Sequence, residues 1–158
     1  MNISGENVTI MELDEYSDSS DVWEDTNRLS HILHMHLERL DCTALVTFDE
    51  YGVSGHPNHI GCHAASIHLH RAHNVRVFVL ESICIWRKYI SVLDLPIALA
   101  FSFLNGSNVI VSRPSIAYTA MREHRTQLVW FRLLYMLFSS YTMINSLRRL
   151  DSRRVKAE

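Results

Sequence analysis

The sequence has few cysteines and little net charge, and each shortage excludes a class of protein. Cys42, Cys62 and Cys84 are odd in number and form no Cys-x-x-Cys pair, so neither a disulfide framework nor a thiolate zinc site is indicated. We therefore expect a reducing compartment. The 15 basic and 17 acidic residues give a formal charge of -2, which provides no broad positive field for nucleic acid phosphates. Nucleic acid is therefore not an expected partner.

Long hydrophobic runs are also missing. The longest apolar stretch, 95–104, contains Pro96 and is followed by Asn105 and Gly106, whereas a helix needs roughly 20 apolar residues to span a bilayer. Residues 1–13 lack the basic region and apolar block of a signal peptide. We therefore expect no transmembrane segment, N-terminal anchor or signal peptide in this chain.

The size and the order of the elements predict one α/β unit. A chain of 158 residues with 47% hydrophobic residues suffices for one compact domain, or part of one, over 1–158. Expected strands are 8–13, 43–48, 75–80 and 108–111. Expected helices are 26–40, 56–71, 81–95 and 115–127. Strands that alternate with helices favour an α/β fold with a parallel sheet.

The stretch 129–147 is apolar nearly all round, and Arg132 is its only charge. We expect it to be helical. A helix without a polar face is either buried or in contact with a membrane surface, and the sequence leaves both alternatives open.

The most informative segment runs from the expected strand 43–48 through a glycine-bearing loop into His56-Pro57-Asn58-His59. Reactive groups of an open parallel sheet collect in the loops after its strands. Two histidines three residues apart at a helix start point to the same side, so His59 can offer a ring nitrogen to zinc while His56 stands beside it. The alternative is a pair of solvent-exposed loop histidines. His63 has helical spacing from His59, but we expect no ligand role for it.

Eight blocks of the sequence match one known family in order and approximate spacing. They are Val-Thr-Phe-Asp (46–49), Gly-Val-Ser-Gly-His (52–56), Asn-His-Ile (58–60), Arg-Lys-Tyr-Ile-Ser (87–91), Leu-Asp-Leu-Pro (93–96), His-Arg-Thr-Gln-Leu (124–128), Trp-Phe-Arg (130–132) and Ile-Asn-Ser-Leu (144–147). By these blocks the chain resembles the C-terminal part of the zinc-dependent, LmbE-like sugar N-deacetylases, and within them the enzymes of glycosylphosphatidylinositol (GPI)-anchor synthesis.

The resemblance implies a Rossmann-like, mostly parallel sheet with flanking helices, and a zinc cofactor. It implies that His59 is a metal ligand and that His56 stabilises the oxyanion and protonates the departing amine. The implied substrate is the glycolipid N-acetylglucosaminyl-phosphatidylinositol. The implied location is the cytoplasmic face of the endoplasmic reticulum membrane, with contact to the membrane surface.

Four further residues are candidates for the site. Asp49 either orients His56 or caps the loop after its strand. His124 and Gln127 match a family block, so they either line the substrate cleft or hold their helix against the sheet. Arg87, in an aromatic and basic stretch, either meets phosphate headgroups or belongs to an ordinary helix surface.

One departure from the family affects the expected activity. The family motif His-Pro-Asp-Asp-Glu, which supplies a second histidine ligand, an aspartate ligand and the general base, does not occur in this chain. A zinc site usually has three protein ligands and a water. We therefore expect a partial domain without its N-terminal strand–helix units, with unpaired strand edges and uncovered apolar faces. The alternative function is a truncated, non-catalytic form that binds lipid or an unspecified protein partner.

Overall fold

The computed structural model of the chain describes residues 5–17, 23, 25–124, 126 and 128–151. Its centre is one four-stranded sheet in the order β1-β2-β4-β3. The strands are β1 Ala44–Phe48, β2 Arg76–Leu80, β3 Asn108–Val111 and β4 Ile144–Arg149. The predicted α/β class is confirmed, and so are three of the expected strands, within a residue at each end.

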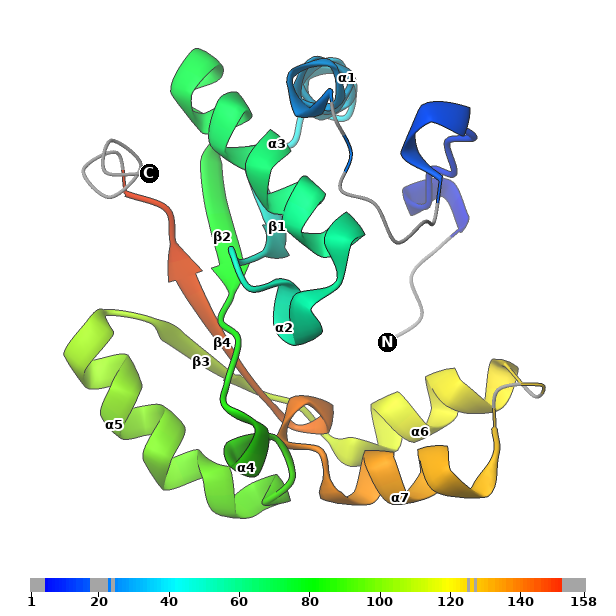
Figure 1. Cartoon of the computed structure of the whole chain (residues 1–158), viewed down its shortest axis with the longest axis vertical. Helices are drawn as coiled ribbons and strands as arrows, with labels where there is room; N and C mark the ends of the chain where they lie inside the picture. Colours follow the sequence, from blue (N-terminus) through cyan, green and yellow to red (C-terminus); the bar gives the residue numbers. More distant parts are fainter. Residues whose placement is uncertain (1–4, 18–22, 24, 125, 127, 152–158) are drawn as a thin grey trace.

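The sheet is mixed: β1, β2 and β3 run in the same direction, as expected for a mostly parallel, Rossmann-like sheet with flanking helices, and β4 runs in the opposite direction. β1 and β2 are parallel, with Ala44 opposite Arg76, but β4 runs antiparallel to both β2 and β3. The cause is the connection after β3. Helices α6 Pro114–Glu123 and α7 Trp130–Phe138 lie side by side as a hairpin (Figure 1). The hairpin brings the chain back to the end of β3, where Ser112 N–H donates to Met143 O just before β4.

Two helices cover the β1–β2 half of the sheet. Helix α1 Thr26–Arg39 packs against α3 Pro57–His73, which packs on β1 and β2 (Figure 1). Both helices were predicted. Trp23 lies over α3 at Gly61, where an added Cβ would be 2.8 Å from the indole ring, so a larger residue does not fit there.

Three predicted elements are wrong. Residues 8–13 form no strand. The expected helix 81–95 consists of the short α4 Ile85–Lys88, the turn Ser91–Asp94 and the start of α5 Leu95–Asn105, because Pro96 begins a helix rather than ending one. The expected helix 129–147 ends at Phe138, since Ser139 is extended and Ile144–Arg149 pairs with β3.

The buried core is small for the apolar content of the chain. Val77, Val79 and Leu150 form its centre, whereas many large apolar side chains of α4, α5, α6 and α7 are exposed. β1 ends the strand order, and its Val46 is 60% exposed. The part of the chain that the structure describes thus has uncovered apolar faces, as expected. None of its helices combines the length and the apolar character needed to cross a membrane.

Candidate functional site

His56 caps the start of α3. Its Nδ1 accepts a hydrogen bond from the backbone N–H of Asn58 at 3.3 Å, in the manner of a helix-capping side chain. A ring nitrogen that accepts carries no proton, so the neutral imidazole of His56 holds its proton on Nε2. Pro57 follows as the first helical residue, where it leaves no unpaired N–H.

His59 has the opposite proton arrangement. Its Nδ1 lies 3.0 Å from the carbonyl oxygen of Gly52, and a carbonyl only accepts, so this nitrogen carries the proton and Nε2 presents a lone pair. The ring of His59 stacks on the ring of Phe48, with their centroids 3.8 Å apart. It is tilted relative to the ring of His56, and these two centroids are 4.9 Å apart. A histidine whose Nδ1–H is fixed by a backbone carbonyl has the arrangement typical of a metal ligand.

The loop between β1 and α3, which contains the single-turn segment α2 Gly52–Gly55, has an unusual backbone. Gly52 has φ 57°, and an added Cβ would lie 3.0 Å from the Cβ of His59. Val53 has φ 66° and ψ −44°, a strained conformation for a β-branched residue. Its N–H donates to the hydroxyl of Ser82 at 2.8 Å.

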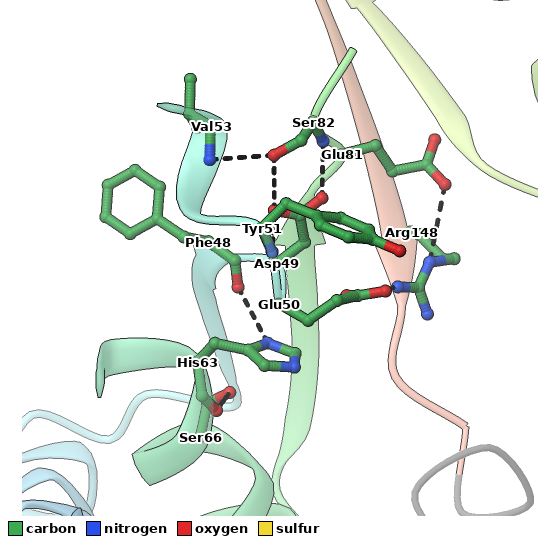
Figure 2. Close-up of polar contacts among 10 residues, drawn as sticks. All are labelled: Phe48, Asp49, Glu50, Tyr51, Val53, His63, Ser66, Glu81, Ser82 and Arg148. Atoms are coloured by element: carbon green, nitrogen blue, oxygen red, sulfur yellow. Dashed lines mark hydrogen bonds and ion pairs between the residues drawn. The ribbon is translucent and has the colours of Figure 1, made fainter. Parts of the chain in front are cut away.

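Asp49 joins the carboxyl ends of the two parallel strands. The side chain is 4% exposed, and one oxygen accepts from Ser82 N–H at 2.6 Å while the other accepts from Ser82 Oγ at 2.6 Å and Tyr51 N–H at 3.2 Å (Figure 2). These contacts correspond to the predicted loop-capping alternative. They involve both carboxylate oxygens, and the alternative role of Asp49 in orienting His56 stays a prediction.

A pocket of about 410 Å³ lies beside Asp49 and Ser82. On its wall Arg148 pairs with Glu50 at 3.2 Å and with Glu81 at 3.5 Å (Figure 2). Next to this wall, the hydroxyl of Tyr141 accepts a hydrogen bond from Ile83 N–H at 2.9 Å. Burial raises the pKa of this phenol. The three carboxylates that line the pocket, Asp49, Glu50 and Glu81, thus already have hydrogen-bond or ion-pair partners.

Arg87 also lines this pocket, but its guanidinium is used within the fold. The side chain is buried, and Nε and Nη2 contact the two carboxylate oxygens of Asp94 at 2.6 and 3.0 Å. The guanidinium also lies 5.0 Å from the ring centre of Phe101. Such a two-pronged ion pair holds α4 to the turn before α5, so the geometry favours a structural role over the predicted binding of phosphate.

The structure does not bring His124 to the two histidines. His124 is exposed and directly follows α6, and the tip of the α6–α7 hairpin lies away from the start of α3 (Figure 1). Gln127, the other residue predicted from the same block, lies outside the described residues.

Sequence reasoning missed Ser82 and the fixed orientation of His63. Ser82 follows β2 as Asp49 follows β1, so its position after a parallel strand was the available signal. His63 is buried, its Nδ1 lies 3.1 Å from Phe48 O, and its Nε2 has no hydrogen-bond partner (Figure 2).

The donor set fits zinc only in part. His59 has the proton arrangement of a ligand, but among the described residues no three His, Cys, Asp or Glu side chains are placed to hold a metal ion. One ligand does not make a closed zinc site. Of the metal ligands that the resemblance implies, this chain thus supplies His59.

Comparisons with known proteins agree with the sequence blocks. No family profile and no solved structure matches the chain. It is similar to the N-acetylglucosaminyl-phosphatidylinositol de-N-acetylase of Bos taurus, at 41% identity over 95% of this chain and 61% of the relative. It is also similar to the "Probable N-acetylglucosaminyl-phosphatidylinositol de-N-acetylase" of Schizosaccharomyces pombe, at 39% identity over 80% of this chain and 54% of the relative.

The chain thus spans a little over half the length of these two relatives. A third relative, from Dictyostelium discoideum, is 27% identical over 93% of this chain and has the same name as the Schizosaccharomyces pombe protein. On these similarities, the chain is related in sequence to the N-acetylglucosaminyl-phosphatidylinositol de-N-acetylases.

Proposed function

We propose that this chain carries one half of a deacetylase site that hydrolyses the N-acetyl group of N-acetylglucosaminyl-phosphatidylinositol in GPI-anchor biosynthesis. The observation that supports it is the pair of opposite proton arrangements at His56 and His59. The other half, including the remaining metal ligands and the general base, belongs to the part of the family domain that this chain does not contain.

Each histidine is suited to a different task in amide hydrolysis. The lone pair on Nε2 of His59 suits a ligand of zinc, which when bound would lower the pKa of a water molecule. The proton on Nε2 of His56 suits a hydrogen bond to the amide carbonyl oxygen as negative charge develops there. The resemblance implies that His56 also delivers a proton to the departing amine.

We propose in addition that the α6–α7 hairpin contacts the membrane that carries the glycolipid, on the cytoplasmic face of the endoplasmic reticulum. Trp130, Leu134 and Leu137 on α7 are exposed, and Arg132 is the only charged residue of that helix. Aromatic and aliphatic side chains without a covering element suit the interfacial layer of a bilayer.

A chimera tests the proposed activity. The segment of the Bos taurus relative that aligns with this chain is replaced by this chain, and acetate release from synthetic N-acetylglucosaminyl-phosphatidylinositol is measured with added zinc. We expect turnover. His59→Ala and His56→Ala should each lower it about 100-fold or more, whereas His31→Ala, at an exposed position of α1, should not. A folded chimera without turnover, or one unaffected by His59→Ala, would contradict the proposal.

A further inference from the structure

A single peptide group, between Gly52 and Val53, links His59 to the strand ends. Its carbonyl oxygen accepts from His59 Nδ1–H at 3.0 Å, and its N–H donates to Ser82 Oγ at 2.8 Å. The carbonyl and N–H of one trans peptide point in opposite directions. The peptide is therefore held from both sides, by the histidine and by the serine.

The hydroxyl of Ser82 has only one available orientation. Its proton is donated to Asp49 at 2.6 Å, and the backbone N–H of Ser82 is donated to the other carboxylate oxygen at 2.6 Å. An ionised carboxylate only accepts hydrogen bonds, so Asp49 directs the Ser82 proton toward itself and leaves the Ser82 lone pairs for Val53 N–H. Asp49 thus fixes the orientation of the Ser82 hydroxyl, and that hydroxyl holds the Gly52–Val53 peptide whose carbonyl faces His59.

The backbone conformation of Val53 indicates that contacts from outside the loop stabilise this peptide. Val53 has φ 66° and ψ −44°, a strained conformation that persists only where surrounding contacts impose it. The hydrogen bond from Val53 N–H to Ser82 is such a contact. We expect the peptide to turn more readily without this hydrogen bond, so that its carbonyl points less consistently at His59.

We propose that Ser82 and Asp49 are positioning residues for His59, acting through the Gly52–Val53 peptide. They keep the proton of the His59 ring on Nδ1 and its lone pair on Nε2. The use of that lone pair for a metal rests on the proposed function, whereas the proton arrangement itself does not.

The proton arrangement is measurable in this chain alone. With ¹⁵N-labelled histidine, the ring nitrogen shifts of neutral His59 should show the Nδ1–H form as the dominant tautomer. Ser82→Ala should move the two nitrogen shifts toward each other, because the ring then exchanges between tautomers. Ser82→Thr, which keeps the hydroxyl, should retain the wild-type shifts. A purely structural role of Ser82 would change stability without changing the tautomer.

Three results would overturn the proposal. They are an Nε2–H tautomer of His59 in the wild-type chain, unchanged shifts in a folded Ser82→Ala variant, and failure of Ser82→Thr to retain them. If Ser82→Ala does not fold, Asp49→Asn provides the second variant, since it keeps the side-chain shape but puts a donor where Ser82 needs an acceptor. It should shift the His59 tautomer in the same direction, and a folded Asp49→Asn chain with wild-type shifts would count against the proposal.

In the active chimera the same variants give a second readout. Ser82→Ala should weaken zinc affinity about 10–100-fold, as for other residues that orient a metal ligand, and Ser82→Thr should recover most of it. Loss of the tautomer without any change in zinc affinity would mean that the positioning is real and that the proposed metal role of His59 fails. Unchanged zinc affinity with an unchanged tautomer would remove the positioning role itself.

Discussion

The rings of His56 and His59 lie 4.9 Å apart and hold their neutral-state protons on opposite nitrogens. The backbone imposes both arrangements, because Asn58 N–H requires an acceptor and Gly52 O requires a donor. One ring is thereby prepared to donate a hydrogen bond and its neighbour to accept one or bind a cation.

Substitution of His56 should separate its capping role from its chemical role. His56→Ala removes the cap of α3, so the free energy of unfolding should fall by about 1 kcal/mol. His56→Ser restores a capping oxygen and should recover that stability, but not acetate release in the chimera. Chemical denaturation and the acetate assay measure the two effects. Recovery of activity by serine would show that His56 acts through the helix start alone.

Gly61→Ala should destabilise the packing of Trp23 on α3. The added Cβ would lie 2.8 Å from the indole, and the clash should lower the free energy of unfolding by about 1–3 kcal/mol. Trp23→Ala should make the second substitution much less costly, so a double-mutant cycle measures the contact. Additive effects of the two substitutions would contradict the observed packing.

The ion pair between Arg87 and Asp94 should be essential for stability. Asp94→Ala leaves a buried guanidinium without its partner and should lower the free energy of unfolding by about 3–5 kcal/mol. The exposed pair of Arg28 and Glu15, at 2.6 Å, provides the control, since Glu15→Ala should cost less than about 1 kcal/mol. Equal effects at the two pairs would mean that Arg87 is not locked in the fold.

Alkaline pH should destabilise the fold through Tyr141. Burial, reinforced by the charge of Asp49, raises the pKa of this phenol above 10.0. The folded state therefore binds the proton more tightly, so this contribution to stability is complete below pH 10.0 and is lost as pH rises through the folded-state pKa. Denaturation at several pH values should show a decline that is shallower in Tyr141→Phe. Identical slopes would rule out this contribution.

The exposed face of α7 should govern binding to lipid vesicles. Trp130→Ser or Leu137→Ser should lower sedimentation with phosphatidylcholine and phosphatidylinositol vesicles about tenfold, because each removes one large apolar side chain from the contact. Ile10→Ser, at a side chain that is 85% exposed, is the matched control and should have no effect. Equal losses in all three variants would point to unspecific adsorption.

The local pattern of the sequence predicted the parts of the fold that short-range periodicity controls. Apolar residues at helical spacing gave α1 and α3, and short apolar runs between turns gave β1, β2 and β3. The resemblance carried by the eight blocks agrees with the names of the relatives to which the chain is similar. The placement of His56 and His59 after a parallel strand also followed from the order of the elements.

Pairing between distant segments decided the remainder. The first four residues of β4, 144–147, lie within the apolar run 129–147 that favoured a helix, and the hydrogen bonds available beside β2 and β3 make them part of a strand. Ser82 and Asp49 are 33 residues apart and meet because β1 and β2 end side by side. The sequence by itself thus determined the local elements and the chemical types at the site. The tertiary structure alone decided which nitrogen of each ring carries the proton, because the partners that fix it are backbone groups placed by the loop.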